Sequence, residues 1–174
     1  MFFEILIPTL VFFLSLYVSL LVSVSAHEFG HAFAALVLGY EVEEINLGIQ
    51  SRPIFDISLK RHVKKIHISL YPFCGEMCLS QNKKTMTSFQ RFIFLIAGPL
   101  GNILVAGVLF FIFVKKPTSP LSISFWDYTL YSILLLNFLT GLFNLIPGDE
   151  SDGSRALEVI TGKYAKRVAL KNKS

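Results

Sequence analysis

The 174-residue chain is long enough for one domain or one compact membrane bundle, but not for two sizeable domains. Hydrophobic residues make up 53% of it and charged residues only 16%, which excludes intrinsic disorder and most soluble folds. The net charge of +4 does not indicate a nucleic-acid partner, because the charges lie between apolar runs rather than over one soluble face. The composition therefore indicates a membrane protein.

Three apolar stretches are candidate membrane spans, at about residues 5–39, 90–114 and 127–146. A bilayer core of about 30 Å needs roughly 20 helical residues, so each stretch is long enough to cross it. The first would reach roughly 52 Å as a helix and must therefore tilt or protrude. The predicted fold class is an all-α membrane bundle of three transmembrane helices with a small β-element.

Lysine and arginine counts predict the orientation of this bundle. Eight basic residues lie between the first two spans and six follow the third, against two between the second and third. The positive-inside rule then places the N-terminus outside and the long loop and C-terminus in the cytosol. We expect a multi-pass protein of the cell membrane, and the Phe- and Ile-rich composition suits a bacterial inner membrane.

The loop at 42–80 is predicted to form a cytosolic or membrane-associated β-hairpin or meander. Three runs in this loop, at 42–49, 54–59 and 66–71, contain β-branched residues that either alternate with other residues or occur in clusters. Turn-like breaks separate the runs. An exposed edge of this element, over 66–71, is expected to hold an unwound peptide by strand addition. After the third span, the tail at 154–174 is predicted to be a basic interfacial helix.

Residues 27–31 read His-Glu-Phe-Gly-His and are the strongest chemical motif of the chain. On a helix, His27 and His31 lie one turn apart on one face and can bind the same metal ion. Glu28 lies beside them and can act on a water molecule as a general base. The alternative is a buried structural pair of histidines, but ionisable residues at membrane depth are costly and usually functional.

A catalytic zinc ion usually has three protein ligands, so the histidine pair needs a third. Asp152 follows the third span by six residues and returns to the predicted cytosolic side, where His27 also lies. The alternative role for Asp152 is an N-cap of the tail helix. Other acidic residues are alternative candidates for the third ligand, namely Asp149, Glu150, Glu41, Glu43, Glu44 and Glu76. His62 and His67 are expected to be ordinary surface residues.

Two further motifs accompany this site. Gly98-Pro99-Leu100-Gly101-Asn102 opens the second span, and Asn144-x-x-Pro147 precedes Asp152-Gly153 at the end of the third. With the histidine motif, and in this order, they resemble the site-2 protease family of intramembrane zinc metalloproteases. The resemblance implies a single metalloprotease domain over 1–174 that binds one zinc ion per chain.

Roles for individual residues are also implied by the resemblance. His27, His31 and Asp152 match the zinc ligands, and Glu28 matches the general base. Asn102 and Asn144 match asparagines near the cleft and are expected to bind substrate. The alternative for both asparagines is an interhelical hydrogen bond, which membrane helices also favour.

The implied activity is hydrolysis of peptide bonds in membrane-embedded substrates, either in regulated intramembrane proteolysis or in peptide and signal-peptide processing. The expected partners are a membrane-embedded protein or peptide and the lipid bilayer, with no nucleic acid. The connection at 115–124 has no room for a substrate-screening PDZ domain, so a regulatory partner protein or a prior cleavage is expected to control access. The alternative is a catalytically inactive pseudoprotease that acts as a membrane adaptor.

Overall fold

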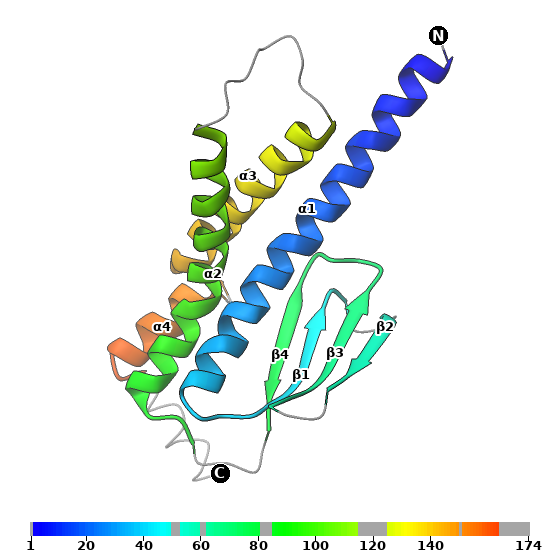
Figure 1. Cartoon of the computed structure of the whole chain (residues 1–174). Coiled ribbons are helices and arrows are strands. Elements are labelled where there is room, and N and C mark those ends of the chain that lie inside the picture. The colour runs from blue at the N-terminus through cyan, green and yellow to red at the C-terminus, as the bar shows by residue number, and fades with distance from the viewer. Residues whose placement is uncertain are drawn as a thin grey trace.

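The computed structural model describes residues 2–49, 53–59, 62–80, 85–114, 125–149 and 151–163. Three long helices lie together, and a small sheet flanks the C-terminal half of the first (Figure 1). The helices are α1 (Phe2–Val37), α2 (Ser88–Val114), α3 (Phe125–Leu145) and α4 (Asp152–Ile160). The strands are β1 (Val42–Leu47), β2 (Pro53–Ser58), β3 (Val63–Ser69) and β4 (Gly75–Leu79).

The three predicted spans are present as α1, α2 and α3. Each is long and apolar enough to cross a membrane, over Leu6–Val37, Ser88–Phe113 and Phe125–Leu145. The chain is therefore a multi-pass membrane protein by the length and composition of these helices. The connection at 115–124 lies outside the described residues.

Buried serines on one stripe of α1 join it to α3. Ser15, Ser19 and Ser23 recur every four residues and are all buried. The hydroxyl of Ser15 lies 2.8 Å from that of Thr129, and the hydroxyl of Ser23 donates to Thr140 at 3.0 Å. Small polar residues let membrane helices approach closely and bond across their interface. This stripe continues, again at four-residue spacing, into the two histidines.

The predicted bundle of three long apolar helices with a small β-element is confirmed, but the β-element is a four-stranded mixed sheet rather than a hairpin or meander, so the description all-α was not exact. The strand order is β2-β3-β1-β4, with β1 parallel to β3 and the other two pairings antiparallel. Strand β3 lies between β2 and β1, so the expected exposed edge over 66–71 was also wrong. The edges are β2 and β4, of which β4 was not predicted.

One apolar face of the sheet explains this order. Ile45 and Leu47 of β1 pair with Ile66 and Ile68 of β3. These four residues pack against α1 in one cluster with Ala32, Ala35 and Val42. Burial against α1 places β1 inside the sheet, whereas every residue of β2 is exposed. The alternation of residues predicts which side chains share a face, but not which strands become neighbours.

Helix α4 begins earlier than the predicted tail. Ser151 is its N-cap and accepts a hydrogen bond from the backbone N–H of Ser154, so Asp152 is the first residue of the helix rather than its cap. Ala156 and Val159 are buried with Leu95 of α2. The rest of the predicted basic tail, 164–174, lies outside the described residues.

Replacement of Ile45 by alanine is expected to destabilise the sheet on α1. Ile45 is fully buried (0% exposed), so the Ile45→Ala variant should lose about 2–5 kcal/mol of unfolding free energy. The control Ile57→Ala, at a side chain on β2 that is 44% exposed, should change it by less than about 0.5 kcal/mol. Equilibrium unfolding in detergent measures both, and equal losses would contradict the packing described here.

Candidate metal centre

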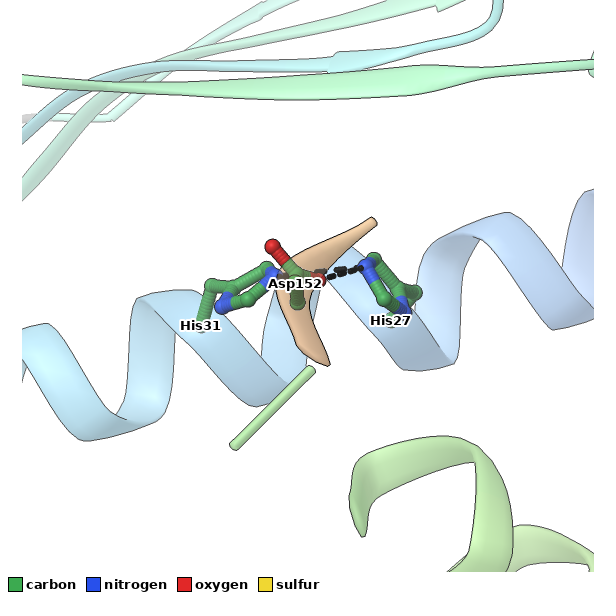
Figure 2. A group of neighbouring side chains, drawn as sticks. All are labelled: His27, His31 and Asp152. Carbon is green, nitrogen blue, oxygen red and sulfur yellow. Dashed lines mark hydrogen bonds and ion pairs between the residues drawn. The ribbon is translucent and has the colours of Figure 1, made fainter. Parts of the chain in front are cut away.

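Helix α1 presents two imidazoles toward one point. His27 and His31 lie one turn apart, with ring centroids 4.8 Å apart and Nε2 atoms 3.2 Å apart. Figure 2 shows that the two side chains flank the carboxylate of Asp152, which comes from α4. The helix spacing in the motif therefore has the geometry that the sequence predicts.

Asp152 completes a compact group of three candidate ligands. Its Oδ2 atom lies 3.0 Å from His27 Nε2 and 3.1 Å from His31 Nε2. A tetrahedral zinc ion with bonds of about 2.0–2.1 Å has its ligand atoms about 3.3 Å apart, so these separations fit such an ion. Two imidazole nitrogens and one carboxylate oxygen are also a donor set that zinc prefers.

Hydrogen bonds behind the imidazoles favour the tautomer that binds metal. His31 Nδ1 lies 2.8 Å from the carbonyl oxygen of Phe94, which can only accept, so this nitrogen is the donor. His27 Nδ1 lies 2.9 Å from Oδ1 of Asn102, an amide oxygen that likewise accepts. A neutral imidazole that donates through Nδ1 keeps a lone pair on Nε2, and both Nε2 atoms face the group.

The charge of Asp152 suits the same role. Burial alone raises the pKa of its carboxyl, but without a metal ion the hydrogen bonds and positive charge that the His27 and His31 imidazoles provide outweigh burial and hold this pKa well below the usual range. Asp152 is therefore ionised at neutral pH. A cation bound here would take the place of the Nε2 protons, so that the ionised oxygen of Asp152 and a lone pair from each imidazole would face it.

Glycines bring α2 and β4 into direct contact with the motif. A Cβ atom at Gly98 would meet the imidazole of His31, and a Cβ atom at Gly75 would meet the carboxylate of Glu28. The backbones of α2 and β4 therefore approach these two side chains at a distance that only glycine permits. Glu28 itself is 5% exposed.

Two cavities meet at Glu28. The larger, of about 640 Å³, contains the three candidate ligands and is bounded by β4, α2 and α4. The smaller, of about 260 Å³, is lined by Val24, Phe73 and Thr140 among others. His27, Glu28 and Asn144 line both. An extended peptide that crossed from one cavity to the other would pass Glu28.

The two predicted asparagines occupy different places. Asn144 of α3 lines both cavities and so lies where a substrate could contact it. Asn102 of α2 is fully buried and lines neither cavity. Its amide group hydrogen-bonds to Ser23, His27 and Asn137. The contacts of Asn102 are thus those of the interhelical alternative.

Of the other candidate ligands, none joins the group within the described residues. Asp149 is exposed and lies outside it, and Glu150 lies outside the described residues. Glu41, Glu43, Glu44 and Glu76 are also not part of it. His62 is exposed, and His67 pairs with Asp56.

Sequence reasoning missed three parts of the site. The backbone carbonyl of Phe94 carries no side-chain pattern that could reveal it. Asn137 was visible only as an uncharged polar residue within an apolar span. Asn46 of β1 lines the larger cavity, and neither polar atom of its buried side chain finds a hydrogen-bond partner in the part of the chain that the structure describes.

Fold and site together define a multi-pass membrane protein with a His-His-Asp cluster of metal-binding type. The family model for peptidase family M50 matches residues 15–125. Zinc metalloprotease MJ0392 of Methanocaldococcus jannaschii is 30% identical over 154 residues, covering 88% of this chain and 36% of that protein. The chain thus spans about a third of this curated relative.

A solved structure agrees with these matches. The site-2 protease from Methanocaldococcus jannaschii has a TM-score of 0.55 and 26% identity, over 91% of this chain and 64% of that chain. The chain belongs to peptidase family M50, and its predicted resemblance to the site-2 proteases is confirmed.

Alanine at position 98 tests whether close approach of α2 orients His31. Because its Cβ atom would meet the imidazole, Gly98→Ala should weaken zinc binding by about 10–100-fold. Gly107→Ala in the same helix is the matched control, since a Cβ atom there meets nothing within 4 Å. Competition with a zinc chelator measures both affinities, and equal values would contradict this role of Gly98.

Proposed function

We propose that this chain is an intramembrane zinc metalloprotease of the site-2 protease type. The observation that carries the proposal is the convergence of His27, His31 and Asp152, with ligand atoms 3.0–3.2 Å apart, beside Glu28. The family and its relatives support the same activity. Zinc bound by these three residues would supply Lewis acidity, which polarises a peptide carbonyl and acidifies water.

Glu28 is the proposed general base. It lines both cavities and follows His27 directly on α1, so its carboxylate lies beside the three ligands. In this role it takes a proton from the attacking water and passes it to the leaving amine. Asn144, at the junction of the cavities, is proposed to hold the peptide backbone.

The proposed substrate is a membrane-embedded protein or peptide. A helical substrate keeps its carbonyls hydrogen-bonded, so it must unwind locally before it can be attacked. Strand β4 is an edge of the sheet and lines the larger cavity through Gly75, Glu76 and Met77. It is therefore the strand that an unwound segment would join, with the orphaned amide of Asn46 as a further hydrogen-bonding group.

The setting of this activity is also part of the proposal. The N-terminus lies outside and the C-terminus in the cytosol, by the distribution of basic residues. The protein forms one domain in a bacterial cell membrane, and a partner protein or a prior cleavage regulates access to it.

Two substitutions separate metal binding from proton transfer. Purified wild-type protein should contain about one zinc ion per chain, and Asp152→Ala should lose it while the exposed Asp149→Ala keeps it. Glu28→Gln should retain zinc but cleave about 10²–10⁴-fold more slowly. Metal analysis and cleavage of single-span model peptides in proteoliposomes measure these effects.

Each result has a distinct consequence. Wild type without zinc, or Asp152→Ala with full zinc, would contradict the proposed ligands. Equal cleavage by wild type and Glu28→Gln would contradict the role of Glu28. A zinc-loaded wild type that cleaves no peptide of the panel would support the inactive adaptor instead.

Proline in β4 tests strand addition. Successive N–H groups of a strand point to opposite sides, so either Glu76→Pro or Met77→Pro removes one from the open edge. At least one of these variants should slow peptide cleavage while zinc content stays unchanged. Ile57→Pro on the other edge strand, β2, is the control and should cleave normally. Normal cleavage by both folded β4 variants would rule out strand addition there.

A further inference from the structure

A chain of buried amides runs behind His27, away from both cavities. Asn137 of α3 is fully buried (0% exposed), and its Nδ2 donates to the carbonyl oxygen of Ile133 at 2.8 Å. This bond directs the other polar atom of Asn137, Oδ1, toward α2. There it accepts a hydrogen bond from Nδ2 of Asn102 at 3.0 Å.

Asn102 is held in one orientation by its neighbours. Its Nδ2 has two hydrogens and two principal acceptors, the carbonyl oxygen of Ser23 at 2.7 Å and Oδ1 of Asn137 at 3.0 Å. With the amide turned over, Oδ1 would face these two oxygens and the amino group would face the N–H of His27. Only the observed orientation presents Oδ1 to His27 Nδ1, at 2.9 Å.

We propose that Asn137 is a positioning residue for the metal centre, acting through Asn102. It orients the Asn102 amide, whose oxygen accepts from Nδ1 of His27 and so leaves the lone pair of Nε2 facing His31 and Asp152. The inference rests on the zinc site of the proposed function. Asn137 touches neither the candidate ligands nor the cavities among the described contacts.

The competing explanation is that Asn137 only joins helices. Asparagines between membrane helices commonly serve as interhelical hydrogen-bonding groups. The two roles differ in what they affect: joining helices changes stability, whereas positioning changes zinc affinity through Asn102. Ser15 and Thr129 provide a control, because their 2.8 Å hydrogen bond also involves α3, while neither side chain hydrogen-bonds to Asn102 or His27 in the described part of the chain.

The experiment measures zinc affinity of the full chain in detergent by chelator competition. Asn102→Leu removes the partner of His27 and should weaken binding by about 10–100-fold. Asn137→Leu should weaken it by a smaller factor, about three- to tenfold, because Asn102 is retained but no longer held. Thr129→Val should lower thermal stability and leave zinc affinity unchanged.

A double variant tests the route through Asn102. In the Asn102→Leu background, Asn137→Leu should cause no further loss of zinc affinity, since the hydrogen bonds from Asn137 through Asn102 to His27 are already absent. An additive loss would overturn the route, and an unchanged affinity in Asn137→Leu would overturn the positioning role. If the leucine variant does not fold, Asn137→Ala removes the same oxygen and provides the same comparison. A wild type without zinc would instead overturn the proposed function itself.

Discussion

The contact of the Asp152 carboxylate with two imidazoles one helical turn apart joins α4 to α1 across 121 residues of sequence. Because the ligand atoms lie only about 3 Å apart, a small displacement of α1 or α4 would separate them. The positions of α2 and α3, which connect these two helices along the chain, are therefore also constrained. Gly98 lets α2 lie against His31, and a Cβ atom at Gly153 would meet the backbone of Leu145 at the turn between α3 and α4. The packing of the bundle therefore determines whether this site can exist.

The polar residues inside the bundle serve this requirement. The serine stripe of α1 holds α3, and the amides of Asn102 and Asn137 link α2 and α3 behind His27. Polar groups within a bilayer are satisfied inside the protein, so they are also directional constraints on helix rotation. The hydrogen bonds of Asn102 to Ser23, Asn137 and His27 thus connect the packing of the three spans to the metal centre.

Local periodicity explains which parts of this arrangement could be predicted. Four-residue spacing on a helix places His27 and His31 together whatever the rest of the fold does, and long apolar runs reveal the spans. Asp152 became a candidate ligand through its position just after the third span, and the resemblance of ordered motifs then matched it to the third zinc ligand. The Phe94 carbonyl and Asn137 could not be assigned, because their partners depend on how α2 and α3 rotate against α1.

The sheet was predicted less completely for a similar reason. Alternation in β1 and β3 identified these strands and their shared faces. Their parallel pairing depends on tertiary packing, because both strands bury their apolar face against α1. Strand β4, Gly-Glu-Met-Cys-Leu, lacks β-branched residues and was missed, although it is the edge strand at the site.

X-ray absorption at the zinc edge of the purified full chain tests the central claim most directly, because it reads the ligands of the metal themselves. The account predicts nitrogen and oxygen scatterers at about 2.0–2.2 Å, with imidazole scattering from two histidines. A sulfur ligand at about 2.3 Å, or a zinc ion without two imidazoles, would contradict a site built from His27, His31 and Asp152.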